Sequence, residues 1–469
     1  MRRIVLLLAV LAVLPPVSAR ADLGPEPHVV VALIDTGINP YSPAFRDDSA
    51  RARQHPSTYI PGYPEDAERL DLTLDPELAY SEAFAADEEK WDYVFPRTLY
   101  WIPGTKIVGL YSFASGGRNC APDDDIPPAN AVLNTGSCRE HVGLDDHGHG
   151  TMTASRAAGV EHSLSPEARV VMVEGLGDQS TAWAGEQAWI DVQSNSWGSI
   201  APGTPAGAIP RAFKAAAKRQ LVFAASGNGL ALGHGIAPQP TQISATGAPG
   251  VIIVGAHDNG RVSPWSSSPA HVVADGYGGY SAFVRSRDAM RPHPGACCTS
   301  AASPYAAGGG AQVVLAARRL LGDDGTTPRA EGVLAIGHSG AIDSGPLSDG
   351  ELTVAEARAV LLGTAEARPK EGADDGLMHF LGGPRAPQNP QHGPGENPFC
   401  EGCFTLPVRW EDVPQSYPAH KDVGYGAVNE RTMVHALEVL RGAVPLVARP
   451  DADAFFARDA DVRRAVYGE

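Results

Sequence analysis

Long apolar runs are missing from this sequence beyond its N-terminus. Residues 4–14 form one continuous apolar stretch, which is shorter than the roughly 20 residues that cross a bilayer as a helix. No later segment among the 469 residues is apolar for long enough to span a membrane. We therefore expect the mature protein to carry no membrane span and to be soluble.

Positive charge is also scarce. The chain has 37 Lys and Arg against 54 Asp and Glu, which gives a formal net charge of −17. Nucleic-acid backbones are bound mainly through cationic side chains, so we expect no nucleic-acid partner. A negative surface mainly supports solubility. The hydrophobic share of 43% is sufficient for a large core.

The N-terminal apolar stretch has the layout of a secretory signal peptide. Two arginines precede it, and small residues follow it. Residues 19–21 (Ala-Arg-Ala) fit a cleavage site, with 17–19 as the second choice. No cysteine follows the stretch, which excludes lipid attachment there. We expect residues 1–21 to be removed, the mature chain to begin at Asp22, and the protein to be secreted or periplasmic.

Cysteine is sparse, and cysteines of exported proteins generally form disulfides. The six are Cys120, Cys138, Cys297, Cys298, Cys400 and Cys403. Local spacing favours the pairs 120–138 and 400–403, which leaves the two neighbours at 297 and 298. For these neighbours, a distant bridge, two buried thiols and a strained bond to each other all stay open. The Cys-x-x-Cys unit at 400–403 has no second ligand pair at zinc-site spacing, so we expect no zinc.

Short apolar runs alternate with helical patterns along much of the chain. Runs typical of buried strands are 29–35, 168–175, 192–198, 221–226 and 251–257. Stretches typical of helices are 152–160, 183–190, 208–219 and 300 to about 321. Continuous apolar strands that alternate with helices indicate a parallel sheet covered on both faces. We therefore predict an α/β fold, a three-layer sandwich with a mainly parallel central sheet.

Two regions interrupt this alternation. Residues 40–145 are rich in Pro, Tyr and acidic residues, and residues 365–421 are rich in Pro, Gly and Asn. We interpret both as long surface insertions in a single domain that covers residues 22–445. Residues 446–469 are interpreted as a charged C-terminal tail.

Four short segments carry residues that are ordinary alone and informative together. Asp35 ends a strand in ALIDTGI, and His149 opens a helix in DDHGHGTMTAS. Asn228 follows a strand in FAASGNG, and Ser300 stands at a helix start in CTSAASP. A serine hydroxyl needs a base to become a nucleophile, and a carboxylate orients and stabilises the imidazole that serves as this base. The Asn228 amide and the Ser300 backbone N–H can hold the oxyanion.

In this order, the segments resemble the subtilisin-like serine proteases, the subtilases. The family pattern D-T/S-G, H-G-T-x-x-A, Gly-Asn and G-T-S-x-A-x-P matches at 35–37, 149–154, 227–228 and 299–304. SNSWG (194–198) resembles the family's substrate-binding strand, which implies that Ser196, Trp197 and Gly198 bind substrate. VIIVGA (251–256), 352–365 and 423–429 resemble further family elements, so the likeness covers most of residues 28–441.

The resemblance implies a role for each matched residue. Ser300 is the nucleophile, His149 the general base and acid, Asp35 the orienting carboxylate and Asn228 the oxyanion donor. His147 stands two residues before His149, but the family motif aligns His149. Small residues after Ser300 let its helix pass close through the core.

The sequence departs from the family pattern at several points. The glycine before Thr-Ser is Cys298, and the bulky residue after Ser300 is Ala301. Asp35 and His149 are 114 residues apart, which is unusually far. Only residues 22–34 separate the expected cleavage point from Asp35, so we expect no folding propeptide. None of these departures removes a catalytic group.

Together these observations predict a secreted serine endopeptidase that acts on peptides or proteins through an acyl-enzyme. The alternatives are a peptide ligase or cyclase on the same scaffold, and a catalytically silent binding scaffold. No cofactor is required by this chemistry. Structural calcium is possible, because the acids of 65–92 and of 123–125 can supply oxygen ligands, although no ligand spacing assigns a site.

Overall fold

A computed structural model describes the chain from residue 27 to 449, with gaps. The described residues are 27–116, 138–139, 141–145, 147–161, 163–198, 207–228, 248–258, 261–262, 266, 270–276, 280–281, 291–292, 299–325, 327, 329–337, 342–366 and 424–449. Within these ranges, no helix combines the length and the apolar character that a membrane crossing requires. The expected signal peptide, most of the 365–421 region and most of the tail lie outside the described residues. Five of the six cysteines lie outside them as well, and only the backbone of Cys138 is described, so the disulfide predictions stay open.

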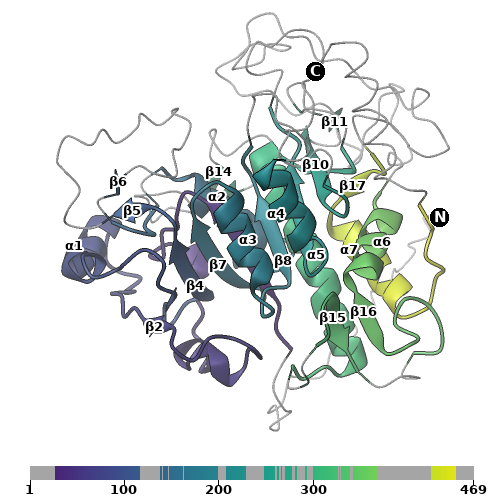
Figure 1. The fold of residues 1–469 in the computed structure, drawn as a ribbon, viewed down its shortest axis with the longest axis horizontal. Coiled ribbons are helices and arrows are strands. Elements are labelled where there is room, and N and C mark those ends of the chain that lie inside the picture. The colour runs from purple at the N-terminus through teal and green to yellow at the C-terminus, as the bar shows by residue number, and fades with distance from the viewer. Residues whose placement is uncertain are drawn as a thin grey trace, which may run out of the picture.

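An eleven-stranded sheet forms the centre of the molecule (Figure 1). Its order is β17-β12-β10-β9-β8-β1-β7-β4-β3-β2, with β11 paired to β10. The strands are β1 (Val30–Asp35), β2 (Glu68–Arg69), β3 (Tyr100–Trp101), β4 (Ile107–Ser112), β7 (Arg169–Glu174), β8 (Val192–Asn195), β9 (Leu221–Ala225), β10 (Ile252–Asp258), β11 (Arg261–Val262), β12 (Val272–Asp275) and β17 (Ala427–Val428). All its pairs are parallel except β3–β4 and β10–β11.

Helices cover both faces of this sheet. They are α1 (Tyr80–Trp91), α2 (His149–Ala158), α3 (Asp178–Glu186), α4 (Ala208–Ala216), α5 (Thr299–Leu321), α6 (Val354–Thr364) and α7 (Glu430–Leu440). Figure 1 shows α3 and α4 side by side on one face. Helices α2 and α5 contact each other on the opposite face, where α6 and α7 pack against α5. The predicted three-layer α/β sandwich with a mainly parallel sheet is therefore confirmed.

Short elements complete the described structure. Three 3₁₀ turns cover Pro43–Phe45, Arg51–Arg53 and Pro56–Thr58. The strand pairs outside the central sheet are β5 (Ser115–Gly116) with β6 (Cys138–Arg139), β13 (Tyr280–Ser281) with β14 (Arg291–Pro292), and β15 (Val333–Ile336) with β16 (Glu351–Thr353).

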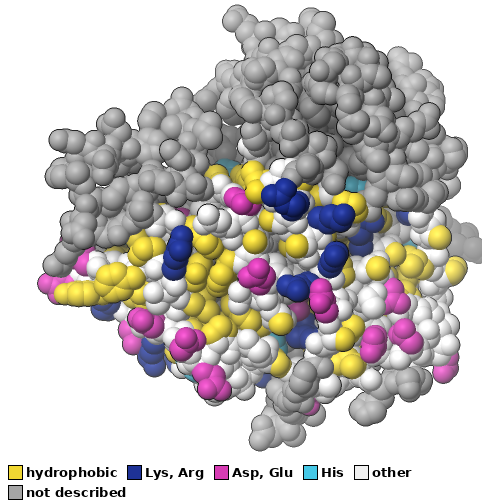
Figure 2. Space-filling model, in the orientation of Figure 1, with side chains coloured by type: hydrophobic (Ala, Val, Ile, Leu, Met, Phe, Trp, Pro, Cys, Tyr) yellow, Lys and Arg dark blue, Asp and Glu magenta, His cyan; other side chains and the backbone are white. Residues whose placement is uncertain are grey.

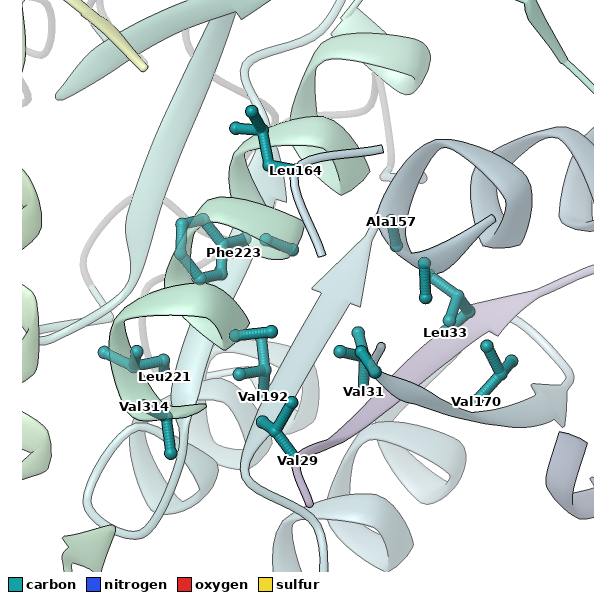
Figure 3. Close-up of a cluster of buried hydrophobic side chains, with 14 of the residues drawn as sticks. Val29, Val31, Leu33, Ala157, Leu164, Val170, Val192, Leu221, Phe223 and Val314 are labelled. Carbon is teal, nitrogen blue, oxygen red and sulfur yellow. The ribbon is translucent and has the colours of Figure 1, made fainter. Parts of the chain in front are cut away.

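Alternate residues of the central strands point into two separate layers of core. On β1, Val31 and Leu33 pack toward α2 and α5, whereas Ala32 and Ile34 pack on the α3 side. Figure 3 shows the first layer, in which Leu33 lies near Ala157 and Phe223 lies beside Leu221. Because both faces are covered, strands such as β1 and β9 are apolar along almost their whole length and show no alternation of polar and apolar residues.

The structure corrects two sequence-based expectations. The helix predicted at 183–190 covers Asp178–Glu186 instead. Residues 40–145 are not all surface insertion, because β4 (Ile107–Ser112) pairs in parallel with β7 inside the central sheet. The same region supplies buried core side chains such as Trp91 and Ile102, which are each 1% exposed. The run that forms β4 is as long as others that predicted strands, but the surrounding region, rich in Pro, Tyr and acidic residues, led to its interpretation as an insertion.

Candidate active site

The predicted catalytic side chains meet at the carboxyl ends of the central strands. Asp35 is the last residue of β1, and Asn228 lies three residues beyond β9. His149 is the first residue of α2, and Ser300 lies in the first turn of α5. This edge of an open parallel sheet is where ligands usually bind.

Asp35 and His149 form a direct pair although 114 residues separate them. His149 Nδ1 lies 2.7 Å from Asp35 Oδ1. The Asp35 side chain is 2% exposed, whereas that of His149 is 26% exposed, so the imidazole reaches the surface and the carboxylate does not. Asp35 also accepts hydrogen bonds from the Thr36 backbone N–H (2.8 Å) and from Thr153 Oγ1 (2.9 Å). These contacts fix the carboxylate and leave the outer imidazole nitrogen, Nε2, for chemistry.

The surroundings of His149 favour its charged form. Burial by itself lowers the pKa of the imidazole, but the Asp35 carboxylate raises it, and the net pKa lies above the ordinary 6.5. The ring centre of His147 lies 6.2 Å from that of His149, and the imidazole hydrogen bond to Asp35 comes from His149.

A second carboxylate, Asp145, holds the turn that carries His149. It is fully buried and accepts hydrogen bonds from Thr36 Oγ1 (2.8 Å), Thr151 Oγ1 (2.6 Å) and the backbone N–H of Thr151 (2.7 Å). The backbone N–H groups of Gly148 and His147 donate to it at 2.8 and 3.2 Å. The sequence analysis did not assign Asp145 a role. Its position four residues before His149, inside the motif DDHGHGT, was the available signal.

Ser300 is tied to the predicted substrate-binding strand by two reciprocal hydrogen bonds. Its Oγ donates to the Ser196 carbonyl at 3.2 Å, and Ser196 Oγ donates to the Ser300 carbonyl at 2.9 Å. In the described part of the chain, no hydrogen bond joins Ser300 to His149. Rotation about the Ser300 Cα–Cβ bond is the motion that redirects this hydroxyl.

The Asn228 amide is oriented by the residue before Ser300. Asn228 Oδ1 accepts hydrogen bonds from the Thr299 backbone N–H (3.1 Å) and from Thr299 Oγ1 (2.8 Å). Gly227 N–H also donates to Thr299 Oγ1 at 3.2 Å, which closes the turn. Because the oxygen side of the amide is engaged, the N–H₂ side is left to donate to a ligand.

The remaining predicted substrate residues line the end of β8. Ser196 is buried, and Trp197 and Gly198 are half-buried. The Trp197 ring lies 5.8 Å from that of Phe213 on α4 and packs against the cores on the α3 and α4 side. Among the described residues, no group of three or more His, Cys, Asp and Glu side chains is arranged to hold a metal ion. The acids at 123–125 lie outside those residues.

Comparisons with known proteins address the whole chain rather than single residues. The model of the Subtilase family, Peptidase_S8, matches residues 26–382. No curated protein is significantly similar in sequence. One similar solved structure is described as "Crystal Structure of a Lanthipeptide Protease"; it shares 15% identity, covers 89% of each chain and has a TM-score of 0.41.

Proposed function

Because this chain belongs to the subtilase family, we propose that it is a secreted serine endopeptidase in which Ser300, His149 and Asp35 act together. The family is one of serine peptidases, so a peptide or protein is the substrate. The observation that carries the proposal is the pair between the buried Asp35 carboxylate and the partly exposed His149 imidazole, held at 2.7 Å at the same sheet edge as Ser300 and Asn228. Export rests on the signal-peptide pattern of residues 1–21.

The first half of the reaction forms an acyl-enzyme. His149 Nε2 takes the proton from Ser300 Oγ, which then bonds to the substrate carbonyl carbon. Asp35 keeps Nδ1 protonated and stabilises the imidazolium that forms. The Asn228 N–H₂ group and the Ser300 backbone N–H donate to the oxyanion. His149 then gives its proton to the leaving amine as the C–N bond breaks.

The second half releases the acyl group. Water enters after the amine has left, His149 takes one of its protons, and the oxygen attacks the ester carbon. The ester bond breaks, and His149 returns the proton to Ser300 Oγ. We propose that Ser196, Trp197 and Gly198 contact the bound peptide. The hydrogen bonds between Ser300 and Ser196 support this, because they hold the segment directly beside Ser300.

The proposal is tested by labelling with a fluorophosphonate and by cleavage of a random peptide library. The wild-type chain, expressed from Asp22, should take up one phosphonate at Ser300 and should cleave peptides. Ser300→Ala should lose both the label and several powers of ten in turnover. Ser303→Ala is the matched control, because Ser303 is a buried serine on the same helix and lies outside the site. Ordinary peptidase activity in Ser300→Ala would refute the assignment.

A further inference from the structure

A buried arginine lies behind the candidate active site, on the helix that carries His149. Arg156 follows His149 by seven residues on α2, which is about two turns, so both side chains lie on the same face of the helix. The Arg156 side chain is only 3% exposed. Arginine is rarely buried to this extent unless it is paired.

Two other elements provide the partners of Arg156. Its Nη2 donates to the Asp275 carbonyl at 2.7 Å and to Asp275 Oδ2 at 3.3 Å. Its guanidinium carbon lies 4.4 Å from the centre of the Tyr305 ring. Asp275 is the last residue of β12, and Tyr305 lies on α5, five residues after Ser300. One side chain therefore joins the His149 helix, the Ser300 helix and the end of a sheet strand.

The positive charge of Arg156 is balanced by the carboxylate of Asp275. His257 lies opposite Asp275 in the β10–β12 register, and burial lowers its pKa to about 4, so it is neutral near pH 7. Tyr305 is neutral there as well, since burial raises its pKa to about 12. A planar guanidinium can stack on an aromatic ring and donate hydrogen bonds at the same time, which lysine does less well.

The contact between α2 and α5 has a second point that shows what Arg156 adds. A Cβ atom on Gly308 would lie 2.5 Å from the Ala157 carbonyl oxygen, so the two helices are as close there as their backbones allow. That contact and the packing of Met152 against Ala301, nearer the site, set the separation of the two helices. Arg156 and Tyr305 add a polar contact between these two apolar ones, and Asp275 ties it to the end of β12.

We propose that Arg156 is a positioning residue, which sets the orientation of the His149 helix relative to the Ser300 helix for proton transfer between the two side chains. The inference rests on the proposed function. Ser300 Oγ donates a hydrogen bond to the Ser196 carbonyl in this structure. The proton transfer therefore depends on the distance and angle between His149 Nε2 and the hydroxyl after the hydroxyl has rotated. A displacement of about 1 Å at such a contact can cost roughly 100-fold in rate.

The experiment compares variants by turnover per active site, with sites counted by phosphonate titration. Arg156→Met should lower kcat per titrated site by about 10- to 100-fold, with a much smaller change in KM. Arg156→Lys keeps a buried cation and should recover part of the loss. Arg319→Met is the matched control, because Arg319 is an exposed arginine on α5 that pairs with Glu167. It should behave as wild type.

The Tyr305 pair of variants tests the same idea if Arg156→Met does not fold. Tyr305→Leu, which loses the ring, should lose more kcat per site than Tyr305→Phe, which keeps it. Wild-type kcat per titrated site in Arg156→Met would overturn the inference, even with a lowered melting temperature, as would equal rates in the two Tyr305 variants. If Ser300 of the wild type does not react with the phosphonate, the proposed function is wrong, and the inference about Arg156 is wrong as well.

Discussion

Two buried carboxylates lie near one imidazole in this protein, and their partners give them different roles. Asp35 contacts the titrating group itself, through the 2.7 Å pair with His149 Nδ1. Asp145 instead accepts only from hydroxyl and backbone N–H groups, on Thr36 and on the turn before and after His149. Burial raises the pKa of Asp145, and the hydrogen bonds from Thr151, Gly148 and Thr36 oppose this effect. Asp35 is thus the main group that raises the pKa of His149, to which Asp145 adds a smaller effect, and the hydrogen bonds of Asp145 fix the position of the turn.

The charge of His149 predicts the pH dependence of activity. The imidazole must be neutral to accept the Ser300 proton, and its pKa lies above 6.5 because of Asp35. Activity should therefore rise with pH through an apparent pKa above 6.5. Asp35→Asn removes the raising charge and leaves burial, which lowers the pKa, so the acid limb of kcat/KM should shift to lower pH while turnover falls.

This pH profile is measured on a peptide substrate, with Asp71→Asn as the control. Asp71 is an exposed carboxylate paired with Arg69, so its loss should leave the acid limb in place. An acid limb that stays fixed in Asp35→Asn, or that moves to higher pH, would contradict the proposal that Asp35 raises the pKa of a His149 base.

At the scale of elements, the site depends on how closely α2 approaches β1 and its following turn. Gly150 follows His149, and a Cβ atom there would lie 2.2 Å from the Gly37 carbonyl oxygen. Its backbone N–H donates to Thr36 Oγ1 at 2.9 Å. The glycine after His149 is therefore a packing requirement, because any side chain would push the helix start away from Asp35.

Gly150→Ala should destabilise the protein, although alanine is normally the better helix former. Alanine replaces glycine in a helix with a gain of about 0.5–1 kcal/mol, but overpacking against rigid backbone costs about 1–3 kcal/mol or more. We expect a net loss of stability in denaturant unfolding, together with a loss of turnover. Gly62→Ala is the comparison, because its Cβ would meet no atom within 4 Å and the change adds only left-handed backbone strain. A more stable Gly150→Ala would show that the two segments can separate freely.

At the scale of the whole molecule, the two ends of the central sheet have different roles. The carboxyl end holds the candidate site, and the amino end holds a buried ion pair. Arg318 on α5 pairs with Asp191 before β8, and it also donates to the carbonyls of His28 and Leu334. Asp191 accepts from the Val30 N–H at 2.9 Å. Helix α5 is thereby fixed at the end opposite Ser300.

Charge is unevenly spread over the surface. The chain as a whole is acidic, with a formal net charge of −17. Figure 2 nevertheless shows basic side chains gathered around α4, with acidic ones scattered near them. Arg211 and Lys214 on α4 are exposed, as are Lys218 and Arg219 directly after it. The negative net charge of the whole chain therefore does not give the sign of the charge on the face around α4.

Buried histidines predict that the fold is sensitive to acid. Burial lowers the pKa of His257 to about 4 and that of His28 to about 3, and burial together with Arg358 lowers the pKa of His271 well below 6.5. Below pH 6.5 the unfolded chain binds more protons than the native one, so the free energy of unfolding falls as pH falls. His257 alone should account for about 3 kcal/mol between pH 6.5 and 4.

Denaturant unfolding at several pH values between 7 and 4.5 measures this effect. His257→Gln should show a smaller loss of stability over the same range than the wild type. His435→Gln, at a partly exposed position on α7, should keep the wild-type slope. Equal slopes for wild type and His257→Gln would show that His257 does not carry the difference.

Much of the fold follows from local sequence. Apolar runs such as 29–35 and 221–226 predicted β1 and β9 because a strand covered on both faces must be apolar throughout. The helix expected from 300 to about 321 is observed as Thr299–Leu321. Helix α3 was misplaced because its first turn, Asp178–Thr181, is polar and its apolar residues lie only toward its end. Segment β4 was missed because it lies within residues 40–145, a region rich in Pro, Tyr and acidic residues that was interpreted as a surface insertion.

The sequence alone predicts the reactive residues and their order along the chain, Asp35, His149, Asn228 and Ser300, and its motif favours His149 over His147. The atoms that meet are known only from the tertiary structure. It pairs His149 Nδ1 with Asp35, joins Asp145 to Thr36, orients the Asn228 amide through Thr299, and buries Arg156 against Tyr305. Strand and helix patterns depend on near neighbours in sequence, whereas contacts such as His149–Asp35, Thr36–Asp145 and Thr299–Asn228 join distant segments that the packing of the sheet and its helices brings together.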